Sequence, residues 1–188
     1  MNVPAAVLVA LPQGPFAGVL VDPDLCDPGA EPIGRFKGKV SFLSNYHRAP
    51  HLLAGPLDNG IVWATTEHSF NAGKDGRREV REWIASAPDP NEAKRRGNSR
   101  KDVLLVPDWD ETVRYDRMTA CVSAKFRAHP GRVAALLGTD RRPLVEGNVW
   151  HDQIWGSCSC GRDACGAPGQ NALGSTLMVL RLALSLGQ

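Results

Sequence analysis

Residues 65–74 read Thr65-Thr66-Glu67-His68-Ser69-Phe70-Asn71-Ala72-Gly73-Lys74, and this stretch decides the interpretation of the chain. Thr66 can cap a helix, so the stretch predicts a helix over residues 66–74 with Glu67 in its first turn. Positions 67, 71 and 74 lie four and seven residues apart and share one helix face, with Phe70 beside it. A carboxylate, an amide and an ammonium group would line that face. The other interpretation is a solvated surface stripe, in which the helix dipole favours the first-turn glutamate.

His68 is a general acid or base by side-chain type. As the next residue after Glu67, it points about 100° away around the helix. We therefore expect a packed or hydrogen-bonded histidine and leave His68 out of the candidate site.

Outward from this stretch, the chain predicts short strands first and helices later. Apolar runs between Pro-, Gly- and Asp-rich turns predict strands at residues 7–11, 19–21, 39–42 and 61–64. Further helices are predicted at residues 79–86 and 91–97, then from an Asp110 cap to a point before Pro130, and finally over about 15 residues through Leu173 and Leu184. There is no βαβ alternation and no glycine-rich nucleotide-binding string. The expected fold is α+β and predominantly helical, an orthogonal helical assembly with a small, mostly antiparallel sheet.

The composition is that of an ordinary globular protein. The 188 residues carry a net charge of +2, with 43% apolar and 22% charged residues, which excludes a disordered tail, a collagen-like fibre and a small disulfide scaffold. We expect one domain over residues 1–188. No apolar run approaches the roughly 20 residues of a membrane span, and the first residues lack a secretory signal. The expected location is cytoplasmic, without membrane contact, and an odd count of five cysteines fits a reducing compartment.

A second polar and aromatic stretch covers residues 144–156 and contains Trp150, Trp155, Asn148 and Asp152. Indole rings can stack on a flat base, and an adjacent Asp and Asn can bond sugar hydroxyls. The alternative is that both tryptophans belong to the core.

A third stretch, residues 166–174, is a Gly-rich loop leading into the last helix, whose free backbone N–H groups could bind phosphate. The segment from Lys94 to Lys101 carries five cations in eight positions and could also hold phosphates. A solvated basic face is the alternative reading of these cations.

Cys158, Cys160 and Cys165 place three thiols within eight residues, and His151 or Cys26 could complete four zinc ligands. This spacing matches no standard two-plus-two zinc knuckle. We therefore assign no metal site, and a structural zinc protein stays an alternative interpretation.

Seven ordered strings together resemble one known family. They are Phe42-Leu43-Ser44-Asn45-Tyr46, Thr66-Glu67-His68-Ser69-Phe70 with Lys74, Glu92-Ala93-Lys94-Arg95-Arg96-Gly97, Pro107-Asp108-Trp109, Lys125-Phe126, Asp152-Gln153-Ile154-Trp155-Gly156, and Gly169-Gln170-Asn171-Ala172-Leu173-Gly174 with Leu177-Met178 and Arg181. The chain resembles the NADAR (NAD and ADP-ribose) superfamily of YbiA-like N-glycosidases and ADP-ribosyl-guanine glycohydrolases. The resemblance covers residues 36–182, leaving an N-terminal extension of residues 1–35 and a Cys-containing insertion after Gly156.

The resemblance implies a YbiA-like fold and hydrolysis of the bond between a base nitrogen and C1 of a phosphorylated ribose, without a cofactor. The expected substrate is ADP-ribosyl-guanine in nucleic acid, including ADP-ribosylated DNA. One alternative is the ribosylamino-pyrimidine phosphates of riboflavin synthesis, and another is a non-catalytic ADP-ribose or NAD sensor. The implied catalytic residues are Glu67, Lys74 and Asp152. The implied substrate-binding residues are Ser44, Asn45, Phe70, Asn71, Arg96, Trp155, Gly156, Asn171 and Gly174.

Overall fold

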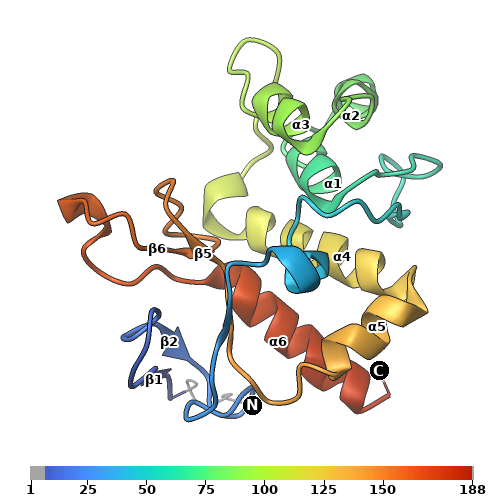
Figure 1. The fold of residues 1–188 in the computed structure, drawn as a ribbon. Coiled ribbons are helices and arrows are strands. Elements are labelled where there is room, and N and C mark those ends of the chain that lie inside the picture. Colours follow the sequence, from blue (N-terminus) through green and yellow to red (C-terminus); the bar gives the residue numbers. More distant parts are fainter. Residues whose placement is uncertain (1–6, 188) are drawn as a thin grey trace, which may run out of the picture. The chain divides into compact units, whose positions relative to one another are not determined.

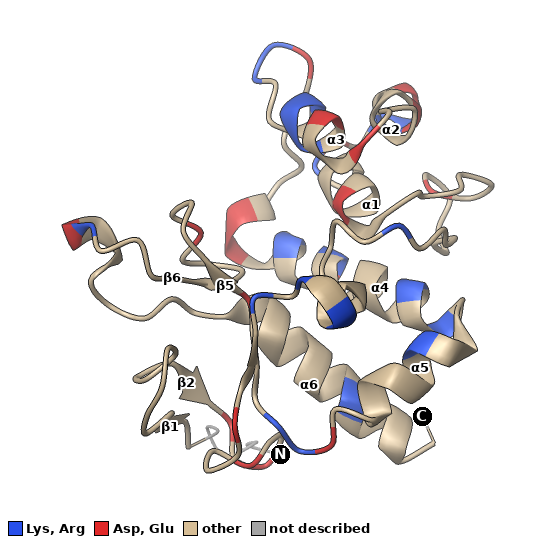
Figure 2. Cartoon of the chain, in the orientation of Figure 1, with Lys and Arg blue, Asp and Glu red and all other residues tan. Residues whose placement is uncertain are grey.

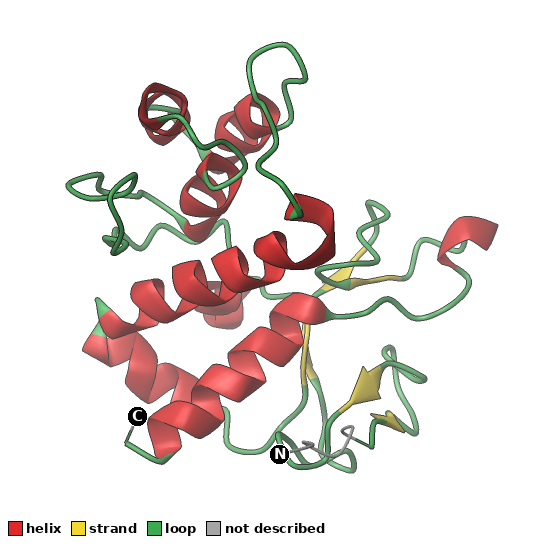
Figure 3. Cartoon of the chain, turned by 180° about the vertical axis from the view of Figure 1, so that it is seen from behind, coloured by secondary structure: helices red, strands yellow, loops and turns green. Residues whose placement is uncertain are grey.

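The computed structural model describes residues 7–187 of the chain. These residues form two compact units, one of residues 7–44 with 134–187 and one of residues 45–133. Helices make up most of the regular structure and the strands are short (Figure 3), which confirms the expected α+β, predominantly helical fold. The single domain expected over residues 1–188 stays a prediction.

In the 45–133 unit, helix α1 (Thr66–Ala72) packs against α2 (Arg78–Ala85), α3 (Pro90–Gly97) and α4 (Arg114–Arg127), as Figure 1 shows. Every residue of α1 is buried. A helix this short is marginal in water by itself. Its stability therefore comes from the three helices around it.

The helix starts differ from the predicted caps. Thr65, rather than Thr66, caps α1, because its Oγ1 accepts a hydrogen bond from the His68 N–H while Thr66 is buried inside the first turn. Asp110 does not cap the long helix. A π-helical turn, Trp109–Val113, follows Asp108 in the left-handed region and runs directly into α4.

The carboxylate of Asp58 is the centre of a buried charge network in this unit. It accepts a hydrogen bond from Arg81 of α2 at 2.8 Å and two from Arg117 of α4 at 2.6 and 2.9 Å. Arg117 also donates to the Ser69 carbonyl of α1 at 2.9 and 2.7 Å. Burial alone would raise the pKa of Asp58, but the two guanidinium groups outweigh it and hold that pKa below its ordinary value. One loop carboxylate thus joins three helices.

The other unit contains three two-stranded pairs and the last helix. Strands β1 (Val9–Ala10) and β2 (Leu20–Val21) pair antiparallel. Strands β3 (Ile33–Gly34) and β4 (Leu144–Val145) pair in parallel, as do β5 (Gly147–Asn148) and β6 (Ser157–Cys158). Helix α6 (Ala172–Ser185) packs against β4. The strands therefore do not form the single, mostly antiparallel sheet that the sequence predicted.

Other predicted elements also need correction. Residues 39–42 lie in a 3-10 helix, Gly38–Leu43, because Val40 and Ser44 bond carbonyls three residues back instead of a partner strand. Residues 61–64 contribute only an isolated bridge between His51 and Trp63. Helix α5 (Pro130–Leu137) begins where the preceding helix was predicted to stop, since proline fits the first helical position. Within residues 7–187, no helix combines the length and apolar character needed to cross a membrane.

We predict that Asp58→Asn lowers the free energy of unfolding by about 3–5 kcal/mol, because removing one charge of a buried network leaves its partners uncompensated. Glu82→Gln is the matched control, since it breaks the exposed Arg78–Glu82 pair and should cost less than about 1 kcal/mol. Urea unfolding followed by circular dichroism measures both values. Equal losses in the two variants would contradict the role given to Asp58.

The same network predicts an acid-dependent loss of stability. Because the folded pKa of Asp58 lies below its ordinary value of 3.8, its contribution is complete above that value and disappears as pH falls through the folded pKa. The difference in unfolding free energy between wild type and Asp58→Asn should therefore shrink at the acid end. A constant difference down to pH 2 would contradict this prediction.

Candidate active site

Three polar side chains on one face of α1 form a hydrogen-bonded series. The Asn71 Nδ2 group donates to Glu67 Oε1 at 3.0 Å and to the Glu67 carbonyl at 2.9 Å. The Lys74 Nζ group, just beyond the helix, donates to Asn71 Oδ1 at 2.8 Å. The predicted stripe is therefore present, and it is not a solvated surface, because Glu67 is 7% and Asn71 1% exposed.

Helix α3 completes this series from the other side. An added Cβ at Gly97 would lie 2.6 Å from Asn71 Cβ, so only glycine allows α3 to approach Asn71 this closely. The next residue, Asn98, accepts a second hydrogen bond from Lys74 Nζ. The close contact between α1 and α3 thus holds both the amide and the ammonium group in place.

The electrostatic setting of Lys74 suits proton transfer. Burial lowers the pKa of its ammonium group from 10.5 to about 8. The negative charge of Glu67 opposes this shift, Lys94 adds to it, and Asp110 opposes it. A lysine with this pKa is protonated at neutral pH and can give up its proton readily, as a general acid requires.

Aromatic and amide groups flank the series. Phe70 packs on Trp109 with ring centroids 5.3 Å apart, and Lys74 Nζ lies 5.9 Å from the Phe70 centroid. The Asn45 carbonyl accepts the Glu67 N–H at 3.0 Å and so supports the start of α1. The side-chain Oδ1 of Asn45 is buried and accepts no hydrogen bond among the described residues, and its role in substrate binding stays a prediction.

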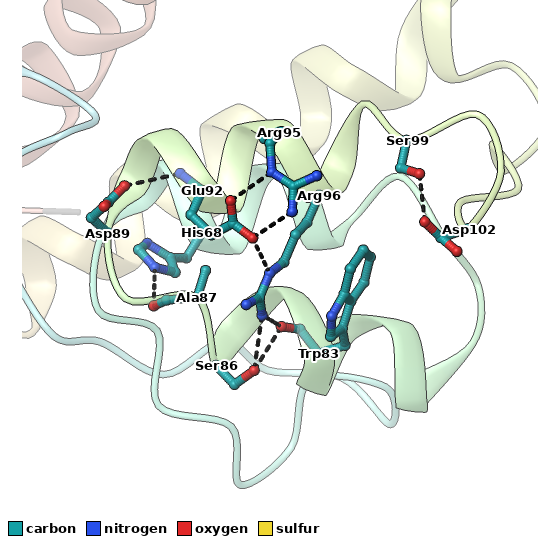
Figure 4. Close-up of polar contacts among 10 residues, drawn as sticks. All are labelled: His68, Trp83, Ser86, Ala87, Asp89, Glu92, Arg95, Arg96, Ser99 and Asp102. Carbon is teal, nitrogen blue, oxygen red and sulfur yellow. Dashed lines mark hydrogen bonds and ion pairs between the residues drawn. The ribbon is translucent and has the colours of Figure 1, made fainter.

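Arg96, a predicted substrate-binding residue, is held by contacts within the protein. Figure 4 shows its guanidinium group between α3 and the end of α2, where it bonds Glu92 at 2.8 Å, Ser86 at 3.0 Å and the Trp83 carbonyl. Glu92 also pairs with Arg95. Arg96 therefore joins α2 to α3, and its role in substrate binding stays a prediction.

His68 is packed, as the helix geometry predicted. Its Nε2 bonds the Ala87 carbonyl at 3.1 Å, as Figure 4 shows, and its Nδ1 bonds Thr65 Oγ1 at 2.8 Å. Because a carbonyl only accepts, Nε2 carries the proton and Nδ1 accepts the Thr65 hydroxyl. Burial lowers the pKa of His68, so the ring is neutral and structural.

The predicted residues of the other unit organise its loops. One carboxylate oxygen of Asp152 accepts the N–H groups of Ile154 and Trp155, at 3.1 and 2.8 Å, and so shapes the turn that presents the half-buried Trp155. Gly156 is tightly packed, since an added Cβ would lie 2.1 Å from the Glu146 carbonyl. The substrate contacts assigned to Asp152 and Trp155 stay predictions.

Asn171 and Gly174 join α6 to β4. The Asn171 amide donates to the Leu144 carbonyl at 2.9 Å and accepts the Glu146 N–H at 3.0 Å, and Asn171 is fully buried. An added Cβ at Gly174 would lie 2.1 Å from the Leu144 carbonyl. These contacts hold α6 against β4, and the binding roles predicted for Asn171 and Gly174 stay predictions. Ser44 ends the 3-10 helix, bonding Ser41 through its N–H, and its role in binding also stays a prediction.

Sequence reasoning did not assign Gly97, Asn98 or Trp109 to the site. Gly97 and Trp109 stand within quoted family strings, which was the available signal. Asn98 directly follows the glycine that ends a helix. Asparagine is common at such helix ends, so its position gave no sign of a role in the site.

Comparisons with known proteins identify the family of the chain. The NADAR domain matches residues 34–185. N-glycosidase YbiA of Escherichia coli (strain K12) is 35% identical over 151 residues, which cover 78% of this chain and 89% of that protein. The riboflavin biosynthesis protein PYRR, chloroplastic, of Zea mays is 31% identical over 172 residues, or 86% of this chain. The chain spans about a quarter (26%) of the length of that maize protein.

The fold is also shared with a solved structure. The NMR structure of Escherichia coli YbiA matches with a TM-score of 0.68 and 30% identity, covering 82% of this chain and 85% of that one. Together with the match over residues 34–185, these similarities confirm the resemblance seen in the ordered strings, and the chain belongs to the NADAR domain family.

Proposed function

We propose that this protein is an N-glycosidase that hydrolyses the bond between a base nitrogen and C1 of a phosphorylated ribose, and that it removes ADP-ribose from guanine in nucleic acid. The observation that carries the proposal is the buried hydrogen-bonded series of Glu67, Asn71 and Lys74. The hydrolase class is supported by family membership and by the relatives named N-glycosidase YbiA.

The proposed reaction uses the two charged ends of this series. As the C1–N bond breaks, its electron pair leaves with the base and positive charge develops on the ribose ring. The Glu67 carboxylate stabilises that charge and orients the attacking water. Lys74 gives a proton to the departing base nitrogen, and the water oxygen forms the new bond to C1 while its proton passes to solvent or back to Lys74.

Positive charge near Lys74 favours a phosphorylated substrate. Lys94 is close enough for its charge to lower the pKa of Lys74, and Lys94, Arg95, Arg100 and Lys101 are exposed. Figure 2 shows this basic character on α3. Arg96 is held by Glu92 and the end of α2, so the proposal assigns the phosphate contacts to the exposed cations instead.

A second candidate substrate has its own support. The maize relative is named a riboflavin biosynthesis protein, which favours ribosylamino-pyrimidine phosphates of that pathway. These compounds also present a base-linked nitrogen on C1 of a phosphorylated ribose, so the same Glu67 and Lys74 chemistry applies. The two candidates differ in the size of the anion rather than in the bond cleaved.

We predict that the wild-type protein removes ADP-ribose from an oligonucleotide ADP-ribosylated on guanine faster than it cleaves a ribosylamino-pyrimidine phosphate or NAD. Glu67→Gln should reduce the rate by about 10²–10⁴-fold, because no carboxylate then stabilises the positive charge that develops on the ribose ring. Chromatographic product assays measure all three reactions. Glu82→Gln, the same substitution at an exposed glutamate of α2, should leave the rate unchanged.

The outcomes separate the candidates. Fast cleavage of the pyrimidine phosphate alone selects the riboflavin substrate and excludes the guanine adduct. Tight ADP-ribose binding without turnover of any substrate, the same in wild type and Glu67→Gln, would show a sensor and would falsify the enzyme proposal.

We also predict that kcat/KM falls as pH rises through about 8, because the Lys74 ammonium loses its proton there. Below that pH the proton donor is present, so the loss is confined to the alkaline limb. Lys74→Arg retains a charged group and should lower the rate while moving this limb to higher pH. Lys39→Arg, at an exposed position, serves as the control. An unchanged alkaline limb in Lys74→Arg would contradict the assignment of Lys74 as the proton donor.

A further inference from the structure

Three thiols and one imidazole converge within residues 151–165. The ligand atoms of His151, Cys158, Cys160 and Cys165 all lie within 4.8 Å of one another. His151 Nδ1 is 3.3 Å from Cys160 Sγ and 3.4 Å from Cys165 Sγ. None of these cysteines is in a disulfide.

These separations suit a tetrahedral metal ion. Zinc bonds of about 2.3 Å to sulfur and about 2.0–2.1 Å to nitrogen place neighbouring ligand atoms roughly 3.5–3.8 Å apart. Small side-chain rotations would bring all four donors to those distances. Three sulfur ligands and one imidazole nitrogen are a donor set that zinc prefers and that Mg²⁺ and Ca²⁺ do not.

The backbone delivers the four ligands from separate local structures. Asn148 holds the loop that carries His151, since its Oδ1 accepts the Trp150 and Asp152 N–H groups and its Nδ2 donates to the Asp152 carbonyl. Cys158 lies on β6, which pairs with β5. Gly161, at φ +77°, reverses the chain after Cys160.

The last ligand comes from a short 3-10 helix, Asp163–Cys165, which turns the Cys165 side chain back toward the others. Cys26, the other candidate for the fourth ligand, is fully buried elsewhere, with its thiol 3.5 Å from the Asp22 carbonyl. Of the two candidates for the fourth ligand, His151 and Cys26, only His151 lies with the three clustered cysteines.

We propose that His151, Cys158, Cys160 and Cys165 bind one structural Zn²⁺ ion. Binding releases three thiol protons to solvent, and Zn²⁺ with three thiolates and a neutral imidazole carries a net charge of −1. Four protein ligands leave no open coordination position, so the ion has a structural rather than a catalytic role. This assignment replaces the expectation that the chain has no metal site.

The zinc ion would hold the part of the loop that carries the four ligands. Hydrogen bonds of Gln153 already hold the two ends of that loop together. Gln153 accepts the Cys158 N–H at 2.7 Å, donates to the Ala167 carbonyl at 2.7 Å, and accepts the Gln170 N–H through its own carbonyl at 2.8 Å. These hydrogen bonds of Gln153 close the loop next to the turn formed at Asp152. Zinc therefore holds in place the segment that presents Asp152 and Trp155.

Elemental analysis of the full-length protein, produced with zinc in the medium and desalted, tests the proposal. We expect about one zinc ion per chain in wild type and at least a fivefold loss in Cys160→Ser and His151→Ala. Cys26→Ser is the matched control, because it makes the same substitution at a thiol outside the cluster, and it should retain zinc. Circular dichroism establishes that each variant is folded.

Cobalt substitution of wild type gives a second measurement that needs no variant. Tetrahedral Co²⁺ with three thiolates should show intense visible d–d absorption together with thiolate-to-cobalt charge transfer, and zinc should abolish both signals. A wild type that binds neither zinc nor cobalt, that contains iron instead, or whose clustered cysteines are found as a disulfide would overturn the proposal. Full zinc retention in both ligand variants would do the same.

Discussion

The buried carboxylate of Asp58 is the constraint on which the 45–133 unit depends. Charges removed from water must be paired, and here one carboxylate satisfies guanidinium groups from two helices. Arg117 then extends the pairing to the Ser69 carbonyl of α1. The short central helix is thus fixed by hydrogen bonds on one side and by the close approach of α3 at Gly97 on the other. Fixed in this way, α1 can carry a polar stripe in the interior of the unit.

Burial of the polar stripe formed by Glu67, Asn71 and Lys74 costs free energy, because these side chains lose hydrogen bonds to water. Hydrogen bonds among the three side chains offset that cost. Asn71 is the linking group, because its amide can donate to Glu67 and accept from Lys74 at the same time. Burial also keeps Lys74 near the point of losing its proton. A preorganised carboxylate and a readily released proton are the two elements that cleavage of a base–ribose bond demands.

Much of this could be predicted from local spacing. The helical period placed positions 67, 71 and 74 on one face, and it located the last helix. Partners that come from another element could not be predicted in this way. Asn98 reaches Lys74 through the packing of α3 on α1, and the inward course of Arg96 depends on the end of α2. Parallel pairing of two-residue strands likewise leaves no periodic signal, because such strands are shorter than one pattern repeat.

The side chain of Asn171 behaves as a surrogate peptide unit. It offers one donor and one acceptor to the backbone of Leu144 and Glu146, as a neighbouring strand would. Aspartate has the same shape but no donor, so it would set a carboxylate oxygen against the Leu144 carbonyl. A carboxylate in place of this amide would therefore turn an attraction into a repulsion at the start of α6.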